Sequence, residues 1–205
     1  MQMKRCVVKI YKNELRANGF FAYIPFNDKK KIQVLITCNH FINGEDISLE
    51  QEIKISKDND SNIYDFKIDK SRKTYTNEVY DVTFIEIKEE EKNSFNSFLE
   101  IDDDIESLEL MGKNQHIYLL HYLGSYPISY SLAELGNIGD NYCLKYKCSA
   151  GQGSCGCPIL RLSNNKVIGI HIGCYSKLDE GIGTNIKYPI KDCISAFNKY
   201  NNTSN

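Results

Sequence analysis

The spacing of apolar residues is the feature that most restricts the fold of this chain. Short apolar segments alternate with polar turns rich in Asn, Asp and Lys. The segments are rich in Val, Ile, Tyr and Phe, which favour strands, and their brevity is typical of a β-sandwich or β-barrel. We predict strands over Cys6–Tyr11, Gly19–Ile24, Ile32–Thr37, Ile53–Ile55, Val82–Ile87, Ile117–Tyr122, Cys143–Tyr146, Pro158–Leu162, Val167–Ile172 and Thr184–Ile186.

The end of the chain follows another period. Ile190, Ile194 and Phe197 fall near helical spacing after Pro189, which predicts a closing amphipathic helix over about 189–200. The sequence therefore predicts an all-β chain with one C-terminal helix.

An acidic stretch, Glu89–Leu110, lies mid-chain and is interpreted as a polar connection with a helical turn. It separates an N-terminal half of about 1–95 from a C-terminal half of about 110–188. Since we find no internal repeat and no long linker, we expect residues 1–205 to form a single domain.

Charge and hydropathy exclude several classes of partner. The formal net charge of −2 argues against a nucleic-acid binder, which would carry a basic face. No apolar run approaches the roughly 20 residues that span a bilayer, so we expect no membrane association. The first residues lack the apolar core of a secretory signal, and we expect a cytoplasmic protein.

The sequence contains eight cysteines, which in a reducing compartment are expected to be free thiols. Cys155, Cys157, His171 and Cys174 have the residue types of a zinc site, and a redox or zinc-binding protein is one alternative function. Their C-x-C and H-x-x-C spacings are looser than those of structural zinc sites. We therefore expect neither metal nor cofactor.

Two ionisable residues lie next to predicted strands. His40 follows the apolar strand that ends at Thr37, and Asp81 precedes the strand that begins at Val82. A strand end is a stiff support for a general base. Each residue also has an ordinary structural explanation, as a satisfied histidine at a strand boundary and as a turn aspartate.

Residues 153–158 (Gly-Ser-Cys-Gly-Cys-Pro) form a more specific pattern. Glycines flanking Cys155 allow a sharp turn in which successive N–H groups point into one concavity. The N–H groups of Gly153 and Cys155 are therefore candidate donors to an oxyanion. The alternative is a glycine-rich hairpin with a buried cysteine.

Together these segments resemble the chymotrypsin-like (trypsin-like) peptidase superfamily, whose motifs are T-A-A-H, D-[IV]-[AT] and G-x-S-G-x-P. The chain has Thr-Cys-Asn-His at 37–40, Asp-Val-Thr at 81–83 and Gly-Ser-Cys-Gly-Cys-Pro at 153–158, in the same order. The resemblance implies two six-stranded antiparallel β-barrels with the active site between them. It also implies an endopeptidase that forms a covalent acyl-enzyme on peptide or protein substrates, with His40 as general base, Asp81 as its orienting partner and residue 155 as nucleophile.

The chain departs from the usual pattern at the nucleophile, where Cys155 replaces serine. Viral 3C-type proteases, similar in fold, use cysteine in a G-x-C-G setting. Cys155 is thus either a natural nucleophile or an engineered replacement in a serine protease, and the sequence leaves both open. A catalytically silent protease fold used as a binding module is a further alternative.

Substrate preference is expected to depend on residues 169–173 (Gly-Ile-His-Ile-Gly), which resemble the G-x-H-x-G of 3C-type and glutamate-specific proteases. The resemblance implies that His171 lies in the S1 pocket and hydrogen-bonds a Gln or Glu side chain at P1. Ser149, Ala150 and Gly173 are the other expected S1 residues. The alternative is that His171 packs inside the second barrel.

Overall fold

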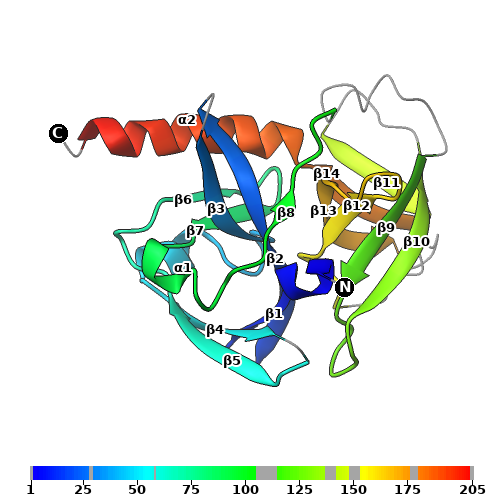
Figure 1. Cartoon of the computed structure of the whole chain (residues 1–205), viewed down its shortest axis with the longest axis horizontal. Coiled ribbons are helices and arrows are strands. Elements are labelled where there is room, and N and C mark those ends of the chain that lie inside the picture. The colour runs from blue at the N-terminus through cyan, green and yellow to red at the C-terminus, as the bar shows by residue number, and fades with distance from the viewer. Residues whose placement is uncertain are drawn as a thin grey trace.

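The computed structural model describes residues 2–27, 30–57, 59–104, 115–136, 142–147, 153–175 and 180–203. Two β-rich halves lie side by side, and the C-terminal helix returns across the N-terminal half (Figure 1), where it packs against strands β2 and β6. Within the described ranges, no helix is both long and apolar enough to span a bilayer.

The N-terminal half is a sheet of eight described strands in the order β5-β4-β1-β2-β3-β7-β6, with β8 paired in parallel to β2. Its elements are η1 (Gln2–Cys6), β1 (Val7–Lys12), β2 (Leu15–Asn27), β3 (Lys30–Thr37), α1 (Gly44–Ser48), β4 (Glu52–Lys57), β5 (Asn62–Lys67), β6 (Thr74–Asn77), β7 (Val82–Glu86), η2 (Glu89–Glu91) and β8 (Leu99–Glu100).

The C-terminal half is a closed antiparallel barrel of six described strands in the order β10-β11-β14-β13-β12-β9. Its elements are β9 (Gln115–His121), β10 (Ser129–Leu135), β11 (Cys143–Lys147), β12 (Pro158–Arg161), β13 (Val167–Tyr175), β14 (Glu180–Asn185) and the helix α2 (Lys187–Thr203). The predicted all-β class, the six-stranded C-terminal barrel and the closing helix are confirmed. The N-terminal half has more strands than the six expected.

Strands β3 and β7 form the rigid centre of the N-terminal sheet. The last four residues of β3 and the first four of β7 are all buried, because neighbouring strands and side chains cover both of their faces. The strands pair antiparallel with Thr37 opposite Thr83. The end of β3 and the start of β7 therefore lie at the same edge of the sheet, which fixes where the segments beyond them meet.

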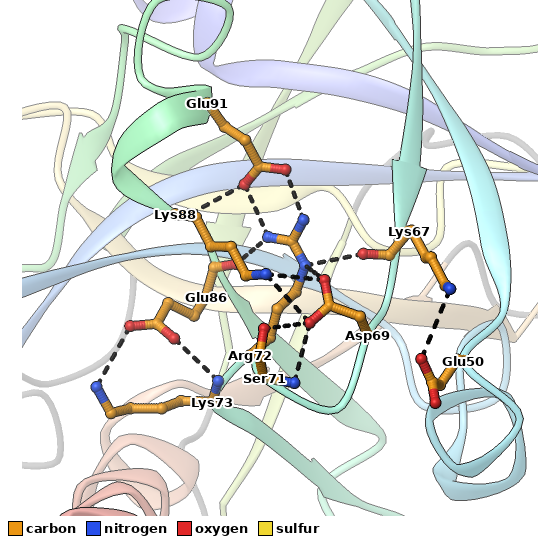
Figure 2. A network of polar contacts seen from close by, with 9 residues as sticks. All are labelled: Glu50, Lys67, Asp69, Ser71, Arg72, Lys73, Glu86, Lys88 and Glu91. Atoms are coloured by element: carbon orange, nitrogen blue, oxygen red, sulfur yellow. Dashed lines mark hydrogen bonds and ion pairs between the residues drawn. The ribbon is translucent and has the colours of Figure 1, made fainter.

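A buried arginine connects three segments of this half (Figure 2). Arg72 is 5% exposed, and its guanidinium donates two hydrogen bonds to Glu91, at 2.7 and 2.5 Å. The guanidinium lies 4.2 Å from the centre of the Phe66 ring. It also donates to the carbonyl oxygens of Lys67 (2.8 Å) and Glu86 (2.9 Å). One side chain thus holds the ends of β5 and β7 against η2.

Replacing Arg72 with methionine should lower the free energy of unfolding by about 3 kcal/mol, because breaking a buried ion pair from one side costs roughly 3–5 kcal/mol and Glu91 is partly exposed. Urea denaturation measures this loss. The control is Lys67→Met, which removes only an exposed contact to Glu50 at 3.7 Å and should change stability by less than about 0.5 kcal/mol. A loss below about 1 kcal/mol for Arg72→Met would contradict the role given to the network.

Candidate active site

His40 lies on a turn immediately beyond the buried end of β3. The N–H groups of Phe41 and Ile42 donate to the carbonyl oxygen of Cys38 at 3.2 and 3.1 Å, which closes the helical turn expected at this point. The His40 side chain is 50% exposed. His40 therefore follows directly on a rigid, buried strand, while half of its side chain is exposed to solvent.

Asp81 immediately precedes β7 and reaches His40 across the sheet edge. Its Oδ2 lies 2.6 Å from His40 Nδ1, and its Oδ1 accepts a hydrogen bond of 2.8 Å from the His40 backbone N–H. Thr83, two residues further on, donates to the Ile42 carbonyl oxygen at 2.5 Å and holds the same turn. The carboxylate thus fixes both the position and the orientation of the imidazole.

The loop that carries Cys155 comes from the C-terminal half. Gly153 and Gly156 have φ values of +96° and +88°, a region that favours glycine. The Gly156 N–H donates to the His171 carbonyl oxygen at 2.8 Å, and the His171 N–H donates to the Cys157 carbonyl oxygen at 2.9 Å. These backbone hydrogen bonds to strand β13 hold the loop in place. Cys155, which the loop carries, is half-buried.

The Cys155 thiol and the His40 imidazole interact directly. The pKa of His40 is raised to about 10, first by its hydrogen bond to Asp81 and next by a hydrogen bond to Cys155, and these outweigh the lowering effect of burial. The Cys155 Sγ also lies 3.4 Å from the carbonyl oxygen of Ile172, to which a neutral thiol donates. The arrangement favours a protonated imidazole, which is the partner that stabilises a thiolate.

The N-terminal sheet also contacts the Cys155 loop through Asn18 on β2. The Asn18 backbone N–H donates to the Cys155 carbonyl oxygen at 2.9 Å. Its side-chain Nδ2 donates to the carbonyl oxygens of Gly153 (2.9 Å) and Tyr122 (3.1 Å), while Oδ1 accepts from the Tyr122 N–H (2.7 Å). One residue therefore joins the sheet, the barrel and the loop.

A buried thiol lies behind the His40–Asp81 pair. In the part of the chain that the structure describes, the potential metal-ligating atoms of Cys38, His40 and Asp81 all lie within 4.8 Å of one another. Burial raises the pKa of the Cys38 thiol well above its usual value, and its Sγ donates to the His171 carbonyl oxygen at 3.5 Å. Because metals bind thiolates, a thiol held protonated in this way is a poor ligand.

The four residues considered for zinc differ widely in exposure. Cys157 is buried, Cys155 is half-buried and Cys174 is exposed, whereas His171 lies inside the barrel. All seven cysteines in the described ranges are free. Among those ranges, the cluster close enough to share an ion is the Cys38 group and not this one.

His171 lies inside the C-terminal barrel, with 1% of the residue exposed. Its Nδ1 is 2.6 Å from the hydroxyl oxygen of Tyr146, and burial, with a smaller effect from His121, lowers its pKa to about 4. The ring is therefore uncharged at neutral pH. Gly173 lies two residues further along β13, at a bulge where an added Cβ would meet no atom of the described residues within 4 Å.

The remaining residues expected in the S1 pocket, Ser149 and Ala150, lie outside the described residues. The sequence patterns do not indicate Asn18, Cys38 or Tyr146. The one signal for Asn18 in the sequence is its place as a polar residue beside the apolar run that follows it, and the structure buries every residue of Ala17–Ala22. Cys38 and Tyr146 look like ordinary core residues in the sequence.

Several solved protein structures are similar to this one in fold. The active form of the Rv3671c protease from M. tuberculosis matches with a TM-score of 0.65 and 15% identity over 95% of this chain and 81% of its own. Deg5 matches with a TM-score of 0.62 and 15% identity over 93% and 88%. A serine endoprotease from Yersinia pestis matches with a TM-score of 0.65 and 14% identity over 95% and 64%.

The fold is that of the chymotrypsin-like proteases. At these identities the likeness establishes the fold alone. No protein-family model and no curated protein matches the sequence. In this chymotrypsin-like fold, His40 and Asp81 come from the N-terminal half and Cys155 comes from the C-terminal half.

Proposed function

We propose that the protein is an endopeptidase that hydrolyses peptide bonds through a covalent acyl-enzyme on Cys155. The observation that carries the proposal is the set of contacts made by His40, which is hydrogen-bonded to both Asp81 and Cys155. A nucleophile in contact with a base, and a third group that orients the base, are the requirements for this chemistry.

Each residue has a defined role in the proposed reaction. Transfer of the Cys155 thiol proton to His40 gives a thiolate–imidazolium pair, and the thiolate attacks the carbonyl carbon of the substrate. The N–H groups of Gly153 and Cys155 donate to the oxyanion, and the C–N bond breaks as the His40 imidazolium protonates the departing amine. His40 then removes a proton from water, whose oxygen attacks the thioester and releases the acid and the thiol. Asp81 keeps the imidazole oriented throughout.

We further propose a preference for glutamine or glutamate at P1, conferred by His171. Its contact to Tyr146, 2.6 Å at Nδ1, is shorter than the 3.4 Å between the Tyr146 hydroxyl and the Ile182 carbonyl oxygen. This difference favours Tyr146 as the donor to Nδ1, which leaves the ring proton on Nε2. An uncharged N–H donor matches a carboxamide oxygen, so glutamine should be preferred to glutamate at neutral pH.

A diverse peptide library tests these proposals. The protein should cleave the library and Cys155→Ala should not, because the Ala form lacks the attacking atom. Equal absence of cleavage by both forms would overturn the peptidase proposal. Cys155→Ser should be slower than the native form, and a faster Ser form would indicate a site suited to serine. The cleaved bonds should be enriched after Gln, and lack of enrichment after Gln or Glu would exclude the role given to His171.

A further inference from the structure

We propose that the side chain of Asn18 positions the oxyanion-binding loop of this protease, an inference that rests on the proposed peptidase function. Asn18 lies on β2 in the N-terminal sheet and is 1% exposed. The loop at 153–157 belongs to the other half of the molecule. The two halves contribute different parts of the reaction, so a residue that joins them at this point sets the geometry between those parts.

Both polar atoms of the Asn18 side chain are hydrogen-bonded. Its two amide hydrogens donate to the carbonyl oxygens of Gly153 and Tyr122, and its oxygen accepts from the Tyr122 N–H. The pair of contacts to Tyr122 resembles the pairing of two strand residues and anchors Asn18 to the end of β9. The remaining contact, to the Gly153 carbonyl oxygen, holds the loop at the point where Gly153 has a φ of +96°.

The two contacts that Asn18 makes to the loop reach the peptide units before and after the one that carries the Cys155 N–H group. The side chain holds the carbonyl oxygen of Gly153, and the Asn18 backbone N–H holds the carbonyl oxygen of Cys155. The peptide units before Ser154 and after Cys155 are thereby fixed, and the N–H of Cys155 lies on the unit between them. Because oxyanion stabilisation depends on donors that are already in place, fixing the flanking units orients this donor before the substrate binds.

The same residue is connected to the strand that supports the base. The Thr37 Oγ1 donates to the Asn18 carbonyl oxygen at 2.8 Å, and Thr37 is the last residue of β3, immediately before the turn that carries His40. An unbroken series of hydrogen bonds therefore connects the support of His40, through Asn18, to the loop of Cys155. Asn18 acts as a positioning residue and does not touch the substrate.

The test compares Asn18→Ala with the native protein and with Asn185→Ala. Asn185 is also fully buried, but its Oδ1 accepts from the Lys187 N–H at the start of α2, so it controls for the general cost of losing a buried amide. Two rates are measured: peptide cleavage, and alkylation of Cys155 by iodoacetamide followed by peptide mass spectrometry. Alkylation requires the thiolate but no oxyanion donor, so it separates the two parts of the site.

We expect Asn18→Ala to lower kcat on the order of 10- to 100-fold with little change in KM, less than the roughly 10²–10³-fold lost when an oxyanion donor is removed outright. Its alkylation rate should stay within about twofold of native, and Asn185→Ala should retain the native kcat. Asn18→Ser, whose hydroxyl can make one of the lost bonds, should be intermediate and serves if the Ala form does not fold.

Two results would overturn the inference while leaving the peptidase proposal intact. One is a variant kcat close to native, and the other is a loss of cleavage matched by an equal loss of alkylation. If the native protein does not cleave peptides, both proposals fail together, and the native measurement alone identifies that case.

Discussion

Replacing Gly156 with alanine should sharply reduce peptide cleavage, although the change adds a single methyl group. The added Cβ would lie 2.0 Å from the carbonyl oxygen of Asn18, which is backbone and cannot rotate away. The φ of +88° is also unfavourable for any residue with a Cβ. We expect a loss of about 3–5 kcal/mol in the free energy of unfolding, since strain and overpacking each cost roughly 1–3 kcal/mol. We expect cleavage to fall by at least about 10²-fold, because the loop must move out of position.

Two matched variants separate backbone strain from steric collision as causes of this loss. Gly153 has a similar φ of +96°, but its added Cβ would meet no atom of the described residues within 4 Å, so Gly153→Ala introduces the strain without a collision of that kind. Gly44→Ala lies in the first turn of α1, with its nearest contact at 3.8 Å, and should be neutral. Denaturation and cleavage assays on the three variants should rank Gly156→Ala as the most damaging. Native-like cleavage by Gly156→Ala would show that the loop is not held against Asn18 as described.

The strands that could be predicted from the sequence are those with buried, apolar residues. All ten predicted segments coincide with observed strands, because central strands such as β3 and β7 are apolar on both faces. The strands that were missed are short or largely exposed. On β5, one residue of six is buried, and on β10, Tyr130 and Leu132 face outward among serines and a glutamate. Their pairing partners, and not their own composition, define them as strands.

In the candidate site too, some residues are indicated by local sequence patterns and others only by contacts between distant segments. His40, Asp81 and Cys155 lie beside strand ends or glycines, and those local signals are visible in the sequence. The contacts of Asn18 cross 104 positions to Tyr122 and 135 to Gly153, and no local pattern encodes them. The spatial pairing of Tyr146 with His171 likewise depends on barrel closure. The sequence therefore predicts the groups proposed to react, whereas the residues that hold them in place require the folded chain.

Replacing Asp81 with asparagine should shift the alkaline limit of activity to lower pH. Asp81 is the largest cause of the raised pKa of His40, about 10, and a neutral amide removes its charge. In the proposed mechanism the imidazolium must protonate the leaving amine, so activity is present below the pKa of His40 and is lost as pH rises through it. A lowered pKa therefore moves that loss from near pH 10 toward neutrality.

The rate at the optimum should also fall, on the order of 10²-fold, because an amide can turn its NH₂ toward Nδ1 and impose the wrong imidazole tautomer. The loss should be smaller than the roughly 10⁴-fold known for serine triads, because a thiol needs less help from its base. The measurement is kcat/KM from pH 5 to 10.5 on one peptide, with Asp103→Asn as the control. Asp103 pairs with Lys166, on the exposed surface, and its replacement should leave the profile unchanged. An alkaline limb of Asp81→Asn within about 0.3 pH units of native would mean that Asp81 does not set the protonation of His40.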